Sequence, residues 1–185
     1  IPNGKLLSKI YSFFLLVMIA SQSYASNIIE GNLGSKIQGE VISTFNYPWS
    51  FSFLDNEHLL VATKPGKLWL LDSAGAKTAV KNIVSVEHGG QGGLGDVVPH
   101  PNYLENHIIY LSYITSDDGG QTRYAVVAQA ILRDLGSPKL ENIERIWEQF
   151  PAVKGKGHFS HRIAFGPKGT AHENKIFITS GDRQM

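Results

Sequence analysis

The sequence predicts an all-β fold, and three observations support this prediction. From Gly39 onward, short runs of β-branched, aromatic and other apolar residues are bounded by Gly, Pro, Asn or Asp. Beyond the first 25 residues no long amphipathic helical pattern is visible. The composition, 42% hydrophobic and 18% charged, is that of an ordinary globular protein. We therefore expect strands joined by turns and no extensive disorder.

The first 25 residues are predicted to be a secretory signal peptide. Lys5 and Lys9 precede an apolar run over residues 10–20, and Ser23 and Ala25 place small residues where a signal peptidase reads them. An uncleaved membrane anchor is the alternative, but this run is about half as long as the roughly 20 apolar residues that span a bilayer. Residues 26–185 would then form the mature part, with no stable membrane insertion.

Charge and cysteine content narrow the function classes. Loss of Lys5 and Lys9 with the leader would lower the formal charge from +1 to −1, so no basic surface for nucleic acid is expected. The chain contains no cysteine, which excludes disulfides, cysteine-ligated metals and thiol nucleophiles. Export without cysteine fits a bacterial periplasm.

The strand candidates fall into three blocks. The first block covers residues 49–54, 58–63, 67–71 and 79–86, and the second covers residues 95–98, 108–113, 124–132 and 143–147. The third block has two strands, residues 162–165 and 176–178. Because the chain begins with Ile1 and not Met, and ends in an incomplete block, we expect it to be the front part of a longer protein.

The blocks form a weak internal repeat. Each runs strand, turn, apolar strand, and the first two begin about 46 residues apart. Repeats of about 40 to 50 residues with four strands each are typical of β-propellers. A β-sandwich also has many short strands, but the repeated block favours the propeller.

Gln91 and His158 are the candidate site residues. In a propeller the first strand of each blade lines the central channel, so the loop before it lies on one rim. Gln91 and His158 each lie four residues before the first strand of their block. They should therefore converge on one channel mouth, where the glycines around Gln91 would let a flat ligand approach the backbone. An imidazole there can take a proton from a substrate hydroxyl, or it can simply hydrogen-bond a loop.

Other candidates point to structure more than to chemistry. His158 and His161 form an H-x-x-H pair, but on an extended chain they point to different sides, so zinc is not expected. The glycine-rich loop at 89–95 lacks the spacing of a phosphate-binding loop. The remaining histidines are interpreted as structural: His100 in a turn, and His88, His107 and His172 in loops or on the surface. For Asp182 and Arg183 a salt-bridged turn is favoured over a rim pair or a ligand contact, whereas Arg162 could equally place a charge at the channel or form a bridge with Asp96 between blades.

Four segments resemble the soluble quinoprotein glucose/sorbosone dehydrogenase family, which includes periplasmic aldose sugar dehydrogenases. They are residues 48–69 with Pro48-Trp49 and Gly66-Lys67-Leu68-Trp69, residues 90–101 around Gln91, residues 158–165 with the H-x-x-x-R pattern, and residues 176–183 with Ser180-Gly181-Asp182-Arg183. The segments follow the family's order and span most of the predicted mature chain. The glutamine loop and the H-x-x-x-R pattern together are fairly specific.

The resemblance implies a six-bladed β-propeller, of which this chain would hold about two and a half blades. It implies pyrroloquinoline quinone (PQQ) and calcium at the channel mouth. His158 would be the general base and Gln91 a quinone contact, and both would lie beside the substrate. The reaction implied is oxidation of a sugar C1 hydroxyl to the lactone by hydride transfer to the quinone, with an external electron acceptor. The calcium ligands and the other quinone contacts would follow Met185.

The chain also departs from the family pattern. Gly157 stands where some members carry Asp, Ser160 and His161 stand where small residues, often glycine, are common, and residues 170–174 lengthen a usually tight turn. Two alternatives remain: a non-catalytic propeller that binds a ligand or protein, and a calcium-dependent lactonase, which would need carboxylates converging on the channel. The sugar, the acceptor and the oligomeric state are not predicted, and the isolated fragment is expected to be inactive.

Overall fold

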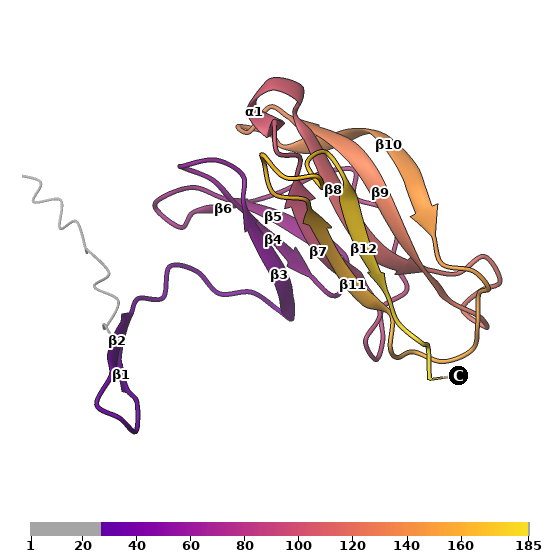
Figure 1. Ribbon diagram of the computed structural model, residues 1–185, viewed down its shortest axis with the longest axis horizontal. Coiled ribbons are helices and arrows are strands. Elements are labelled where there is room, and N and C mark those ends of the chain that lie inside the picture. Colours follow the sequence, from indigo (N-terminus) through magenta and orange to yellow (C-terminus); the bar gives the residue numbers. More distant parts are fainter. Residues whose placement is uncertain (1–26, 185) are drawn as a thin grey trace, which may run out of the picture. The chain divides into compact units, whose positions relative to one another are not determined.

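The computed structural model describes residues 27–184, so the predicted signal peptide lies outside the described residues. The chain divides into two units, one ending at Val41 and the other beginning at Ile42 (Figure 1). The first unit contains an antiparallel hairpin of β1 (Asn27–Glu30) and β2 (Lys36–Gly39), which the sequence analysis did not distinguish. In the part of the chain that the structure describes, no helix is long and apolar enough to cross a bilayer.

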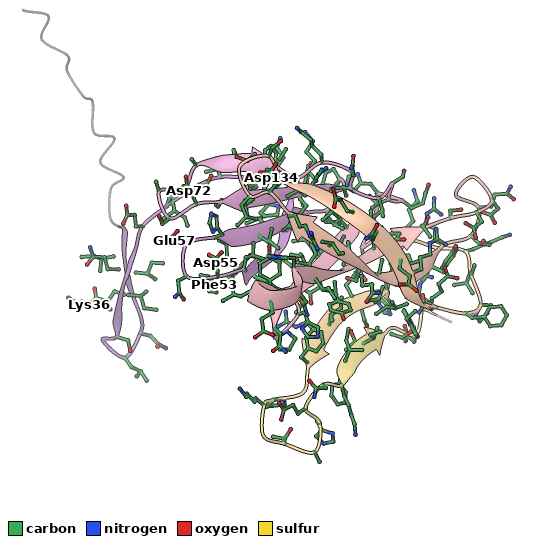
Figure 2. The ribbon with its side chains drawn as sticks, turned by 90° about the horizontal axis from the view of Figure 1, so that it is seen from above. Lys36, Phe53, Asp55, Glu57, Asp72 and Asp134 are labelled. Atoms are coloured by element: carbon green, nitrogen blue, oxygen red, sulfur yellow. The ribbon has the colours of Figure 1, made fainter. Side chains whose placement is uncertain are left out.

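The first four-stranded sheet follows the first predicted block. Its antiparallel strands, in spatial order, are β3 (Pro48–Phe53), β4 (Leu59–Thr63), β5 (Lys67–Leu71) and β6 (Lys77–Ala79). Asp55 turns the chain between β3 and β4, because its carboxylate accepts the backbone N–H groups of Glu57 and His58, both at 2.7 Å. Figure 2 shows Asp55 and Glu57 at this turn, next to Phe53. The predicted fourth strand at 79–86 is misplaced: the strand ends at Ala79, and Lys81 makes only an isolated bridge to Lys139.

The second sheet is also antiparallel and four-stranded. In chain order, its strands are β7 (Leu94–Pro99), β8 (Ile108–Thr115), β9 (Tyr124–Arg133) and β10 (Lys139–Glu148), which are also neighbours in space in that order. A short helix that the sequence analysis did not predict, α1 (Tyr103–Asn106), connects β7 to β8. His107 ends this helix in the left-handed conformation, with φ of 58°.

The third sheet has two antiparallel strands. They are β11 (Ser160–Phe165) and β12 (Ile176–Ser180). The pairing shifts register between Ser160 and Ile163, so β11 begins with an irregular segment. This irregular start lies at the candidate site.

The sheets pack face to face through alternating side chains. Leu60 and Leu68 from the first sheet and Leu94 and Leu111 from the second are fully buried in one shared core. Ser50 adds a hydrogen bond between the sheets, donating to the Gly95 carbonyl at 2.7 Å. A second, smaller core joins the second and third sheets. Burial of a Leu side chain contributes about 1.5–3 kcal/mol to the free energy of folding. The two cores therefore hold the first sheet against the second and the second against the third.

The first strands of the three sheets are neighbours. β3 contacts β7, and β7 contacts β11 (Figure 1). This is the arrangement of inner strands in successive propeller blades. The all-β prediction is confirmed, with two complete four-stranded blades and two strands of a third.

Candidate functional site

A cavity of about 520 Å³ lies where the loops that precede β7 and β11 meet the end of β12. It is lined by Trp49, Gln91, His158, Ser160, His161, Gly181 and Asp182. Its volume is within the range of about 300–1,000 Å³ found for small-molecule sites. Both residues predicted from the sequence, Gln91 and His158, are in its wall.

The loop that carries Gln91 is held by the protein's own backbone. Its N–H group donates to the carbonyl of Lys156 at 2.7 Å. Gly90 (φ 55°) and Gly93 (φ 113°) adopt conformations that favour glycine, and a β-carbon at either would overlap a backbone carbonyl, of Lys156 and Lys64 respectively. These glycines were expected to admit a ligand. In the structure, Gly90 and Gly93 allow close approach of neighbouring loops, and ligand approach stays a prediction.

Gln91 and His158 are in direct contact. The Gln91 side-chain Oε1 accepts the backbone N–H of His158 at 2.7 Å. His158 has a left-handed φ of 50°, and its side chain is 47% exposed. The contact links the two loops and keeps the imidazole at the opening of the cavity.

Asp182 is the partner of the His158 imidazole. His158 Nδ1 lies 2.7 Å from Asp182 Oδ1. The backbone N–H of Gln184 and then the His158 side chain lower the pKa of the Asp182 carboxyl, so it is ionised at neutral pH. An ionised carboxylate requires Nδ1 to carry its hydrogen, which leaves Nε2 of a neutral imidazole as the proton acceptor.

The sequence analysis favoured a salt-bridged turn for Asp182 and Arg183 over a rim pair or a ligand contact; in the structure the two side chains have different partners, and Asp182 lies in the cavity wall. Arg183 is buried, donates to the carbonyls of Gly157 at 3.0 Å and Arg123 at 2.8 Å, and packs over the Phe159 ring. Burial lowers its pKa. The Asp182 carboxylate is therefore free of Arg183 and pairs with His158. The signal for its role was its place two residues after β12, the strand that pairs with β11.

His161 was dismissed as a zinc ligand and is instead buried in the cavity wall. Its Nε2 lies 3.1 Å from the Gln91 carbonyl oxygen, and its ring meets the Trp49 ring edge-on. It is 6% exposed. Trp49, from the start of β3, was quoted only as part of a sequence motif, although it supplies the aromatic wall of the cavity.

Asp96 connects β7 to β11 as the sequence analysis anticipated. It is buried, and its Oδ2 accepts the Ile163 N–H at 2.9 Å. Burial raises the pKa of the Asp96 carboxyl, against the opposing effects of that hydrogen bond and of Arg162. The Arg162 side chain is 75% exposed, with Nε 3.8 Å from Asp96 Oδ2. Its guanidinium is therefore mostly open to solvent or ligand.

The residues present fit a planar anionic quinone in part. Trp49 offers a flat surface, with the Lys64 ammonium 4.9 Å from its ring centroid. The carboxamide of Gln91 and the exposed cation of Arg162 can interact with carbonyl and carboxylate oxygens. Within residues 27–184, no three His, Asp or Glu side chains are grouped to hold a metal ion.

Comparisons with known proteins identify related sequences. The pattern that defines the glucose/sorbosone dehydrogenase family matches residues 45–185. Aldose sugar dehydrogenase YliI of Escherichia coli K12 is 30% identical over 180 residues, which cover 94% of this chain and 44% of that protein. An uncharacterised Synechocystis protein, slr1608, is 29% identical over 151 residues, covering 77% of this chain and 34% of that protein.

Solved structures give the same result. The soluble aldose sugar dehydrogenase of Escherichia coli, in its apo form, matches with a TM-score of 0.66 and 29% identity, covering 75% of this chain and 39% of that one. The PQQ-bound aldose sugar dehydrogenase of Streptomyces coelicolor matches with a TM-score of 0.58 and 25% identity, covering 78% and 41%. The chain thus spans less than half the length of these relatives.

Proposed function

Because the chain belongs to the glucose/sorbosone dehydrogenase family, we propose that the full-length protein is a PQQ-dependent dehydrogenase that oxidises the C1 hydroxyl of an aldose sugar to the lactone. The observation that carries the proposal is the contact of His158 with both Asp182 and Gln91 at one cavity. An oriented imidazole beside an ionised carboxylate is suited to removing a hydroxyl proton. The relative whose solved structure is PQQ-bound supports the choice of cofactor.

His158 is the proposed general base. Its Nε2 accepts the proton of the sugar C1 hydroxyl, while its Nδ1–H group stays hydrogen-bonded to the Asp182 carboxylate. Asp182 then stabilises the imidazolium that forms, because its negative charge is 2.7 Å away. When bound, PQQ supplies the two-electron acceptor that takes the hydride from C1. The sugar loses one proton and one hydride in total, which yields the lactone.

Gln91 is the proposed cofactor and substrate contact. Its Oε1 is occupied by the His158 N–H, so its orientation is set and its Nε2 donates to a ligand in the cavity. Pre-orientation of this kind lowers the entropy lost when a ligand binds. Arg162 and Lys64 would attract the carboxylates of the quinone.

We also propose that the protein is exported to the periplasm. Cleavage of residues 1–25 as a signal peptide would place the reaction in the periplasm, where an external acceptor reoxidises the quinone. Calcium remains a prediction from the resemblance, and no step above depends on it.

The proposal is tested on the full-length protein, reconstituted with PQQ and calcium. We expect aldose-dependent reduction of an electron-accepting dye. His158→Ala should lower kcat by about 10² to 10⁴-fold, the usual contribution of a general base, with PQQ affinity nearly unchanged. Asp182→Asn should give a smaller loss. His172→Ala, in the β11–β12 turn, is the matched control and should behave as wild type.

Two outcomes would overturn the proposal. Tight PQQ binding without sugar oxidation would indicate a non-catalytic propeller, and calcium-dependent hydrolysis of a lactone would indicate the hydrolase alternative. Full activity of His158→Ala would remove His158 from the mechanism while leaving the family assignment unaffected.

A further inference from the structure

His161 has both an unusual backbone conformation and a buried side chain. Its φ is 109°, in the region that favours glycine, and its imidazole is buried, at 6% exposed. Non-glycine residues adopt such backbone conformations only where the surrounding structure enforces them, and these positions cluster at functional sites. The chain therefore carries a bulky ring at a position where glycine would fit with less strain.

The contacts of the ring show what enforces this conformation. Nε2 lies 3.1 Å from the Gln91 carbonyl oxygen and donates to it, since a carbonyl can only accept. On the other side, the Ser112 hydroxyl donates to the His161 carbonyl at 2.8 Å and lies 3.4 Å from Nδ1. The ring packs on Gly95, where a β-carbon would overlap it.

The glycines on either side of Gln91 are held independently of His161, because the Lys64 side chain donates to the Gly90 carbonyl and the Ile114 N–H donates to the Gly93 carbonyl at 3.0 Å. Gln91 itself has two further restraints. Its backbone N–H bonds to Lys156, and its side chain bonds to the His158 N–H. The hydrogen bond from His161 is the contact that ties the Gln91 carbonyl to the second and third sheets. Without it, the Gln91 carbonyl would lose its hydrogen bond to the sheets, although Gly90 and Gly93 on either side would stay anchored.

We propose that His161 is a positioning residue, whose buried imidazole holds the Gln91 carbonyl and so aims the Gln91 carboxamide into the cavity. This inference rests on the proposed function for its consequence, that a quinone binds more tightly when Gln91 is held. The ring also occupies the cavity wall between Trp49 and Gln91, which narrows the space left for the ligand.

Three substitutions in the full-length protein separate the roles of ring and backbone. His161→Gly and His161→Ala both remove the donor, but only glycine relieves the left-handed φ, so the glycine variant should have the higher melting temperature. His161→Gln keeps an N–H donor at about the length of the imidazole Nε2 and should rescue the contact. His107→Gly is the matched control, because His107 has a φ of 58° in the connection between α1 and β8, away from the cavity.

The first measurement is hydrogen exchange of the apo protein. Amides of residues 91–93 should exchange about tenfold faster in His161→Gly and His161→Ala, and near the wild-type rate in His161→Gln and His107→Gly. The second is PQQ affinity by absorbance titration, with the same order of variants and a loss of about tenfold, the effect of one hydrogen bond.

The two measurements distinguish the possible failures. Unchanged exchange at residues 91–93 in His161→Gly would overturn the positioning role, whatever the protein binds. If wild type does not bind PQQ, the proposed function fails, while the exchange result still decides whether His161 holds the loop. Faster exchange with unchanged PQQ affinity would overturn the consequence for the cofactor.

Discussion

At the residue scale, the site depends on a carboxylate that follows β12, whereas some family members carry an acid in the loop directly before the histidine. Gly157 stands where some family members have an acid directly before the histidine. In the structure, Asp182 reaches His158 Nδ1 from the end of β12. Arg183 points away from the cavity, to carbonyls of the loop that precedes β11. The histidine is thus paired with an acid despite the glycine at its side.

The buried His161 predicts a specific pH dependence of stability. Burial lowers its pKa below the ordinary value of 6.5, against the opposing hydrogen bond to Gln91 and with a further contribution from the charge of Lys64. Between the lowered pKa and about 6.5, the unfolded chain binds a proton that the folded chain does not. Stability from this group is therefore complete above about pH 6.5 and falls as the pH drops through that window.

We expect the free energy of unfolding of the full-length protein to fall in that window with a slope of at most about 1.4 kcal/mol per pH unit from this group. Denaturant titrations from about pH 4.5 to 7.5 measure it. His161→Gln should lose this part of the slope, whereas His107→Gln should retain it. Identical slopes in wild type and His161→Gln would show that the imidazole is not responsible.

At the element scale, β7 and β11 are joined by polar groups as well as by packing. Asp96 of β7 accepts the Ile163 N–H of β11, and Ser112 of the neighbouring β8 accepts the Asp96 N–H at 2.7 Å while donating to the His161 carbonyl. The His161 ring fits between these strands only because residue 95 has no side chain. Gly95 is therefore required here for close approach and not for an unusual backbone angle.

Gly95→Ala should destabilise the full-length protein by about 1–3 kcal/mol, the usual cost of overpacking. Its β-carbon would overlap the His161 ring and lie 2.7 Å from Ser112 Oγ. Chemical denaturation measures the cost. Gly136→Ala is the control, since the nearest atom to its β-carbon is Asp134 Oδ1, at an ordinary 3.6 Å. The cost should shrink in a His161→Gly background, and an equal cost in both backgrounds would contradict the predicted contact.

At the scale of the whole molecule, the first sheet has one buried and one open face. Leu60 and Leu68 face the second sheet, whereas Phe51 and Phe53 are 64% and 75% exposed on the other side. A cavity of about 430 Å³ lies on this open face, lined mostly by apolar residues from β3, β4 and the segment before β3. Propeller blades are covered on both faces, so a further blade is expected to cover this one.

Residues 26–185 produced alone should therefore self-associate. We expect size-exclusion chromatography with light scattering to show oligomers or aggregates, and the pair Phe51→Ser and Phe53→Ser to shift the chain towards monomer. Leu104→Ser is the control, because Leu104 is equally exposed, at 74%, on α1. A monomeric wild-type chain would contradict self-association through this face. So would a double variant that is as associated as wild type.

Part of this structure could be predicted from sequence. Residues 58–63 and 67–71 were assigned almost to the residue, because short apolar runs bounded by turn residues are a local signal. The prediction of a fourth strand at 79–86 was wrong beyond Ala79, and α1 was missed. A helix of four residues is too short for a periodic pattern.

The sequence by itself determined the blocks of strands and the matched placing of Gln91 and His158 before two first strands, since both follow from spacing along the chain. The tertiary structure decided which groups meet: Asp182 with His158, and His161 with the Gln91 carbonyl. These contacts depend on the register shift and left-handed residues at the start of β11. Such local departures from regular pairing arise from the packing of neighbouring sheets, which no periodic pattern in the chain encodes.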